Sequence, residues 1–195
     1  IIKFIKANQF DMILLSDYNK GMLTNELVEA IKKLNIPIIV DPKPINMKLF
    51  NKVFAIAPNL KEAKEITNSN TTPTEISKLI AEEYNTHVII TQGPNGTSSY
   101  NKNTKEYNHL PTKAREVYDV SGAGDTFIAT LTLALASKAE LYEATQLANQ
   151  AAGVVVGKFG TATLTLEELK SSFNGKHSKV KTREVKVNNV TFIRF

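Results

Sequence analysis

The feature that most constrains the fold of this chain is a set of four short apolar runs, each of which ends in a polar loop. The runs lie at residues 12–15, 38–40, 53–57 and 88–91. Continuous apolar runs of this length are typical of strands buried on both faces, because a half-exposed strand would alternate apolar and polar residues. Segments with helical spacing separate the runs, at about 24–34, 60–67 and 74–84. This alternation predicts an α/β fold with a parallel sheet covered by helices on both faces.

The remaining segments predict a hairpin, three helices and a separate tail. Short alternating pieces at 97–100 and 105–109 indicate the hairpin. We expect helices to about residue 137, from about 140 to 157, and from Thr165, a candidate cap, to about Phe173. A boundary near residue 174 divides a domain of residues 1–173 from a basic tail or linker, 174–195, whose residues 184–193 predict a second hairpin.

The start of the chain predicts that a segment precedes it. Residues 1–10 mix Ile1, Ile2, Phe4 and Ile5 with Lys3 and Lys6, a pattern typical of the end of an amphipathic helix. The chain has no initiator methionine, and nothing before this helix is present for it to pack against. We therefore expect further structure upstream.

Charge and composition narrow the class of protein. The net charge of +5 comes from residues 174–195, which hold six basic residues and one acid, whereas 1–173 hold 18 of each sign. No Phe, Tyr or Trp lies among the basic residues from 176 to 186, so we expect a solvated linker rather than a nucleic-acid site. There is no cysteine, which suits a cytoplasmic protein, and no apolar run of membrane-spanning length.

The glycine-rich segment 119–127, Asp-Val-Ser-Gly-Ala-Gly-Asp-Thr-Phe, predicts an anion site at the start of a helix. The first N–H groups of a helix have no partner within it and lie at its positive end, and glycines let an anion approach them closely. The carboxylate of Asp125 would oppose a bound phosphate unless it has a task. Acceptance of a proton from an attacking hydroxyl is such a task, so the segment predicts phosphoryl transfer with Asp125 as base.

Polar loops that follow the predicted strands supply further candidates, each with an ordinary structural alternative. Asn59 and Glu62 offer hard oxygen ligands for Mg²⁺, but their spacing fits a helix capping box nearly as well. Lys43 could form an ion pair with a substrate phosphate or, with equal probability, with a nearby carboxylate. Asp17 and Lys20 lie in the loop after the first strand, where open α/β sheets bind ligands.

Five ordered segments resemble a known family. Residues 119–126 are similar to the C-terminal signature of the ribokinase-like (PfkB) carbohydrate kinases, and Asn59 to Glu62 match its Asn-x-x-Glu motif. Residues 16–21, 40–43, 57–62, 116–119 and 151–158 together resemble the heptose 7-phosphate kinases that are fused to an adenylyltransferase. The resemblance implies a three-layer α/β/α fold with a mostly parallel central sheet, in a chain that lacks the N-terminal part and the substrate lid.

The resemblance also implies site roles. Asp125 matches the catalytic base, and the backbone of Gly122, Ala123 and Gly124 matches the anion hole. Asn59 and Glu62 match the residues near Mg²⁺. The positions expected to bind ATP are Asn59, Leu60, Lys61, Glu62, Thr91, Gly93, Gly96, Asn149 and Gly153. Those expected to bind the sugar phosphate are Asp17, Lys20 and Lys43.

The implied activity is ATP-dependent phosphorylation of the anomeric hydroxyl of heptose 7-phosphate, in the synthesis of ADP-heptose for lipopolysaccharide. The full-length protein would be a homodimer, fused to a nucleotidyltransferase domain. Two alternatives remain open. The chain could be another sugar kinase of the family, or a nucleotide-binding fragment that does not turn over.

Overall fold

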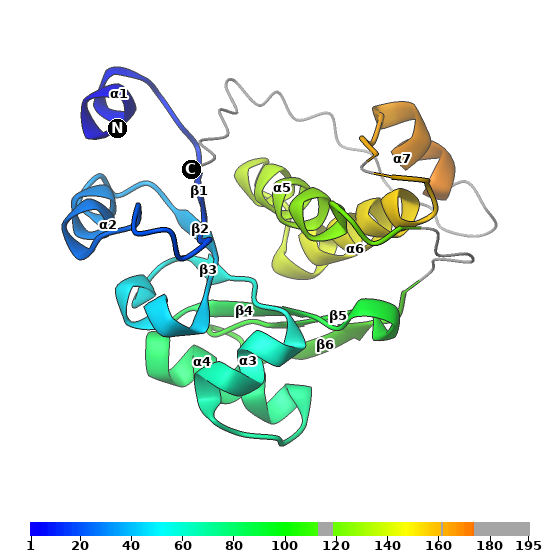
Figure 1. Cartoon of the computed structure of the whole chain (residues 1–195), viewed down its shortest axis with the longest axis horizontal. Coiled ribbons are helices and arrows are strands. Elements are labelled where there is room, and N and C mark those ends of the chain that lie inside the picture. The colour runs from blue at the N-terminus through cyan, green and yellow to red at the C-terminus, as the bar shows by residue number, and fades with distance from the viewer. Residues whose placement is uncertain (113–118, 161, 174–195) are drawn as a thin grey trace.

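A computed structural model describes residues 1–112, 119–160 and 162–173, and Figure 1 shows the whole chain. Its centre is a six-stranded sheet whose strands follow one another in sequence order. The strands are β1 (Ile13–Ser16), β2 (Ile38–Asp41), β3 (Ala55–Ile56), β4 (His87–Thr91), β5 (Thr97–Tyr100) and β6 (Tyr107–Leu110). β1 to β4 are parallel, and β5 and β6 continue the sheet as antiparallel strands. The carboxyl ends of the four parallel strands therefore share one edge of the sheet.

The connections between the parallel strands cover one face. They comprise α2 (Asn25–Lys32), the 3₁₀ helix η1 (Pro44–Phe50), α3 (Leu60–Thr67) and α4 (Pro73–Tyr84). Strands in sequence order with right-handed crossovers place all their connections on the same face. A short N-terminal helix, α1 (Ile2–Ala7), contacts α2, and the 3₁₀ turn η2 (Gly93–Asn95) joins β4 to β5.

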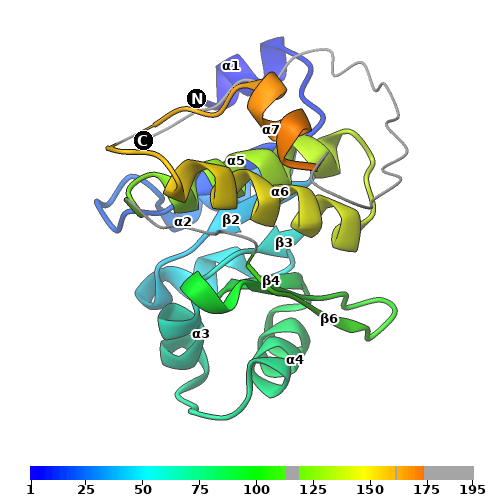
Figure 2. The same ribbon diagram turned by 90° about the vertical axis from the view of Figure 1, so that its right-hand side faces the viewer.

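The C-terminal helices cover the opposite face. They are α5 (Ala123–Ala136), α6 (Leu141–Val156) and α7 (Leu166–Phe173). Figure 2 shows α5 and α6 on one side of the strands and α3 and α4 on the other. No helix in the described part of the chain is long and apolar enough to cross a membrane.

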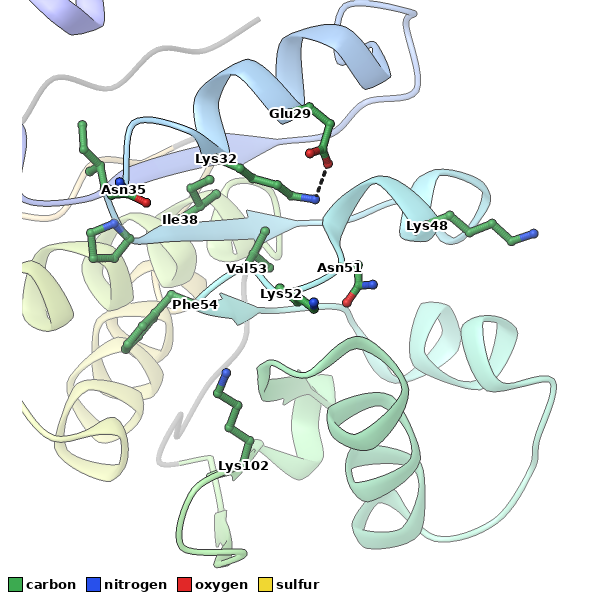
Figure 3. A pocket seen from close by; sticks show the side chains of 12 residues that line it. Glu29, Lys32, Asn35, Ile38, Lys48, Asn51, Lys52, Val53, Phe54 and Lys102 are labelled. Carbon is green, nitrogen blue, oxygen red and sulfur yellow. Dashed lines mark hydrogen bonds and ion pairs between the residues drawn. The ribbon is translucent and has the colours of Figure 1, made fainter.

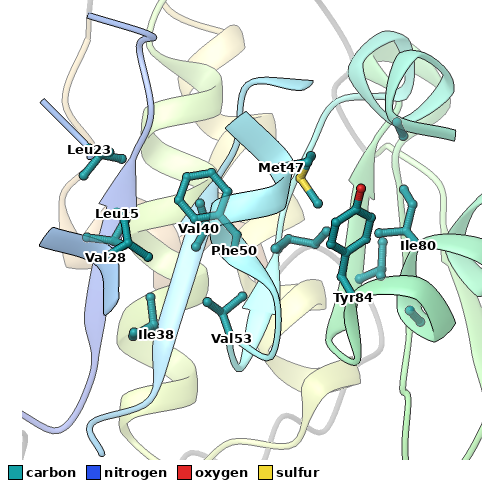
Figure 4. Close-up of a cluster of buried hydrophobic side chains, with 14 of the residues drawn as sticks. Leu15, Leu23, Val28, Ile38, Val40, Met47, Phe50, Val53, Ile80 and Tyr84 are labelled. Atoms are coloured by element: carbon teal, nitrogen blue, oxygen red, sulfur yellow. The ribbon is translucent and has the colours of Figure 1, made fainter. Parts of the chain in front are cut away.

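Each buried strand divides its side chains between two cores. Val40 and Ile90 belong to the core under α2 to α4, whereas their neighbours Ile39 and Ile89 belong to the core under α5 and α6. Figure 4 shows part of the first core, where side chains from β1 and β2 meet those of η1 and α4. Burial of one large apolar side chain contributes about 1.5–3 kcal/mol, so both faces stabilise the sheet.

The α/β/α fold predicted from the sequence is confirmed, and the prediction for one strand was inexact. The apolar run 53–57 supplies only a two-residue strand, because Lys52 has a positive φ of 60° and the Val53 N–H bonds back to Phe50. The 3₁₀ helices have no clear periodicity and were not predicted. The hairpin predicted at 184–193 and the motif residues 116–118 lie outside the described residues.

Candidate active site

One buried carboxylate holds the loop after β1. Asp17 is 3% exposed, and its Oδ1 accepts the Asn19 N–H at 2.8 Å. Its Oδ2 accepts the Lys43 N–H at 3.2 Å and the Asn46 side-chain amide at 3.0 Å. Asp17 therefore ties the loop after β1 to the loop after β2, and we call these four residues the Asp17 clamp. Its contact with a sugar stays a prediction.

An ion pair and a capping box lie beside the clamp. Lys43 Nζ donates to Glu62 Oε1 at 2.6 Å, so this lysine forms an ion pair with a carboxylate of the protein. Glu62 Oε2 accepts the Asn59 N–H at 3.0 Å, and Asn59 Oδ1 accepts the Glu62 N–H at 2.9 Å. This reciprocal pair begins α3 as a capping box. The box is compatible with the predicted roles of both residues near Mg²⁺.

The glycine-rich segment forms a turn and then starts α5. Asp119 accepts the Ser121 N–H at 2.8 Å, a turn-forming bond that lowers the pKa of the Asp119 carboxyl. Gly122 then has a φ of +78°, a left-handed conformation that glycine adopts without a steric cost. No side chain caps α5 at Gly122. Asp125 follows in the first turn, exposed to solvent.

Asp125 is joined to the loops of the sheet by Tyr18. The Tyr18 hydroxyl donates to Asp125 Oδ1 at 3.3 Å, across 107 residues of sequence. This bond connects the start of α5 to the loop that the Asp17 clamp holds. The predicted base, the Lys43–Glu62 pair and the loop after β1 thus lie at one edge of the sheet.

The site is crowded with negative charge. Burial, and next the Glu62 carboxylate, raise the pKa of Asp41 from 3.8 to about 6, although Lys43 opposes the shift. The Asp125 and Asp17 carboxylates contribute to the same upward shift of the Asp41 pKa. The hydrogen bond to Glu62 raises the pKa of Lys43, against the lowering caused by burial. Lys43 thus faces three carboxylates, those of Glu62, Asp41 and Asp17, and a ligand that brings phosphates would need an added cation.

A second group of predicted residues begins at the end of β4. Thr91 forms an isolated parallel bridge with Asn59, and its N–H donates to the Pro58 carbonyl at 3.2 Å. This bridge connects the capping box to the turn that starts at Gly93. The predicted ATP positions of β4 and α3 are therefore adjacent.

Gly96 and Asn149 shape the turn beyond β4. Gly96 has a φ of +88°, and a Cβ there would collide with the Leu110 carbonyl, so no larger residue fits. Asn149 of α6 accepts the Thr97 hydroxyl at 3.0 Å and donates to the Pro111 carbonyl at 3.1 Å. Asn149 thereby fixes α6 to the hairpin. Its contact with adenine stays a prediction.

Other predicted residues lie at the margins of these groups. Lys20 and Lys61 are exposed, and no hydrogen bond or ion pair of their side chains occurs within the described residues. Leu60 is half-buried and packs against the core under α3. Gly93 is exposed in η2, and Gly153 is half-buried in α6.

Sequence reasoning missed three residues of this site. Asp41 ends β2 as Asp17 follows β1, so its place at the end of a buried run could have indicated it. Tyr18 lies inside a segment quoted for the resemblance, but no local pattern indicates a contact with Asp125. Asn46 belongs to η1, which has no sequence signature strong enough to predict.

The opposite edge of the sheet holds a hollow of about 720 Å³ that contains none of the predicted site residues (Figure 3). It lies at the amino ends of β2 and β3. Lys32 is paired with Glu29 at 2.8 Å, and the Lys102 ammonium donates to the Asn85 carbonyl at 2.8 Å. Lys48 points away from the other labelled side chains in Figure 3. Much of the positive charge of this hollow is thus already engaged or directed outward.

The sequence of this chain is similar to those of known proteins. The sequence model for the pfkB family carbohydrate kinases matches residues 2–169. Relatives named bifunctional protein HldE are 39% identical over 172 residues in Syntrophotalea carbinolica and 39% over 190 residues in Campylobacter jejuni subsp. doylei. These matches cover 84% and 92% of this chain. The chain spans 35% and 40% of the length of these two relatives.

Solved structures agree with the family match. Ribokinase from Thermotoga maritima is 26% identical with a TM-score of 0.73, over 85% of this chain and 57% of the ribokinase. Phosphofructokinase-2 from Escherichia coli, at 19% identity, shares the fold with a TM-score of 0.77, over 89% of this chain and 60% of its own. The family match, the relatives and the shared fold show that the chain belongs to the pfkB family of carbohydrate kinases.

Proposed function

We propose that this kinase transfers the γ-phosphoryl group of ATP to the anomeric hydroxyl of heptose 7-phosphate, with Asp125 as the general base. The observation that carries the proposal is the position of Asp125. It lies in the first turn of α5, after a glycine turn without a side-chain cap, at the sheet edge that also holds the Lys43–Glu62 pair. The choice of heptose rests on the five sequence segments, and the relatives named bifunctional support a fused second activity.

In this proposal the protein mainly positions the reactants. The acceptor hydroxyl gives its proton to the Asp125 carboxylate while its oxygen forms a bond to the γ-phosphorus. The bond from that phosphorus to the bridging oxygen breaks, and ADP leaves with the electron pair. The N–H groups at the start of α5 stabilise negative charge on the transferring group, because they lie at the positive end of the helix dipole.

The donor set fits Mg²⁺ that is held mainly by ATP and water. Within the described residues, no three acidic or histidine side chains are arranged to hold a metal by themselves. Both Glu62 oxygens already accept hydrogen bonds, from Lys43 and from the Asn59 N–H. Mg²⁺ commonly keeps several waters and binds one or two carboxylates together with substrate phosphates. We assign Glu62 and Asn59 to that coordination or to its water shell, where the ion would neutralise phosphate charge.

A substrate panel tests the proposal. ADP release is measured with heptose 7-phosphate, ribose and fructose 6-phosphate as acceptors, and the product is identified by ³¹P NMR. Release with heptose 7-phosphate and a new anomeric phosphate signal are expected. The longer Campylobacter jejuni relative serves as the positive control, because this chain spans less than half of its length.

Two results would favour the alternatives. Turnover with another acceptor but not with heptose 7-phosphate would identify a different sugar kinase of the family. Binding of ATP·Mg²⁺ by calorimetry without ADP release from any acceptor would identify a nucleotide-binding fragment.

A further inference from the structure

Tyr18 bridges two parts of the site that are far apart in sequence. Its hydroxyl lies 3.3 Å from Asp125 Oδ1 and donates to it. The side chain is 41% exposed, so burial does not explain its position. The position of a partly exposed aromatic side chain depends on the loop that carries it.

The loop around Tyr18 is fixed on both sides. The preceding residue, Asp17, is buried and accepts three hydrogen bonds in the Asp17 clamp. The following residue, Asn19, has a φ of +53°, and its side-chain oxygen accepts a second bond from Asn46 at 3.2 Å. An asparagine tolerates this left-handed conformation better than most residues. The backbone of Tyr18 is therefore held between two constrained neighbours.

A fixed phenol restricts the Asp125 carboxylate. An exposed aspartate in the first turn of a helix can rotate about its side-chain bonds, and only some rotamers direct an oxygen at a given acceptor. A hydrogen bond from a neutral donor to a charged acceptor is stronger than one between neutral groups. Such a bond lowers the number of orientations that the carboxylate samples before proton transfer, which is a positional contribution to the rate.

We propose that Tyr18 is a positioning residue that orients the Asp125 carboxylate, and that the Asp17 clamp holds Tyr18 for this purpose. The proposal rests on the proposed function of Asp125 as base. It gives Asp17 a task through Tyr18, in addition to any contact with the sugar.

The test combines kinetics with NMR on the whole chain. Tyr18→Phe should lower kcat about tenfold, the share of one hydrogen bond to a charged group, with the KM for ATP unchanged. In an Asp125→Asn background the same change should have almost no further effect, because residues that act as a unit are not additive. Asn46→Ala, which loosens the clamp, should lower kcat by a smaller factor.

An independent signal reports the contact without activity. The chain has six tyrosines, and in a sample labelled at tyrosine Cζ the Tyr18 resonance is the one lost in Tyr18→Phe. Asp125→Asn should shift that resonance. Tyr142→Phe is the matched control, because Tyr142 is 43% exposed and lies in the first turn of α6. It should leave kcat and the Tyr18 resonance unchanged.

The outcomes separate this inference from the proposed function. An active chain in which Tyr18→Phe changes kcat by less than about twofold would overturn the inference and leave the function intact. A Tyr18 resonance whose chemical shift is unchanged in Asp125→Asn would also overturn the inference. An inactive chain whose Tyr18 resonance responds would support the positioning of Asp125 and overturn the proposed function.

Discussion

The starts of α3 and α5 carry an acid at the same helical position and use it differently. Glu62 is the third residue of α3, and its side chain reaches back to the N–H of the capping residue Asn59. Asp125 is the third residue of α5, where the capping residue is Gly122 and no side-chain cap is made. Its carboxylate instead accepts a hydrogen bond from Tyr18, on a distant loop.

The pattern of α3 is the usual one in this chain. α4 begins with a capping box of Thr72 and Glu75, and at the start of α6 Glu143 Oε2 accepts the Glu140 N–H at 3.3 Å. In these boxes the acid satisfies backbone donors of its own helix, so it contributes to stability. At α5 the cap is absent and the acid turns toward another segment. The comparison sets the start of α5 apart from those of α3 and α4, in line with the proposal that it receives a ligand.

The largest expected effect comes from removal of the acid at α5. Asp125→Asn should lower kcat by about 10²–10⁴-fold, the usual share of a general base, with thermal stability and ATP binding retained. Glu143→Gln changes the equivalent acid of α6 and is the matched control. Because glutamine can also accept the Glu140 N–H, this change should lower the melting temperature only slightly and leave kcat unchanged. A loss below tenfold in Asp125→Asn would contradict its role as base.

The pKa of Asp41 is raised by the acids of both helix starts, Glu62 and Asp125. Its folded pKa of about 6 lies above the ordinary 3.8, so the folded state binds more protons between these values and stability falls as pH rises through them. Asp41→Asn should therefore raise the free energy of unfolding at pH 8 by at most about 3 kcal/mol. The gain should vanish below about pH 4.

Urea unfolding in metal-free buffer at pH 8 and pH 4 measures this effect. Asp11→Asn, an exposed carboxylate just before β1, is the control and should change stability little at either pH. Equal stability of Asp41→Asn and the parent at pH 8 would contradict the raised pKa of Asp41, whose first cause is burial and whose second is the Glu62 carboxylate.

A substitution at Gly124, the second residue of α5, should affect helix stability and ligand binding in opposite directions. A Cβ at Gly124 would meet no atom of the described residues within 4 Å. Gly124→Ala should therefore raise the free energy of unfolding by about 0.5–1 kcal/mol, because alanine favours a helix over glycine. The added methyl should nevertheless lower kcat by about tenfold or more, because it obstructs the N–H groups that face the phosphoryl group.

Thermal unfolding and ADP release measured on the same samples decide this prediction. Thr74→Ala changes the second residue of α4 and should raise stability slightly with kcat unaltered. A Gly124→Ala chain with full activity would argue against an anion at the start of α5.

The fold was predictable because its signals are local and repeated. Continuous apolar runs such as 38–40 indicate buried strands, and the strand order then follows from short right-handed connections. Thr24 and Thr165 were predicted as helix caps, and both accept the expected backbone N–H. The two-residue β3 shows the limit, since the positive φ of Lys52, just before the strand, has no signal in the hydrophobic pattern.

The sequence indicated several residues of this sheet edge but not the contacts between them. Strand-end position and glycine spacing indicated Asp17, Glu62 and Asp125. Neither signal says that Lys43 pairs with Glu62, because that contact depends on how two loops pack. The bond from Tyr18 to Asp125 spans 107 residues, and no periodicity in the sequence reports such a distance.

The cap of α3 provides the smallest effect and completes the comparison. Asn59→Ala removes the side chain that accepts the Glu62 N–H, and loss of such a cap costs about 1 kcal/mol of stability. The matched change at α4, Thr72→Ala, should cost about the same in urea unfolding. Only Asn59→Ala should also raise the KM for ATP, since Asn59 lies beside Thr91 and the Lys43–Glu62 pair. If both variants kept the parental KM, the start of α3 would be purely structural, and α5 alone would define the nucleotide side of the site.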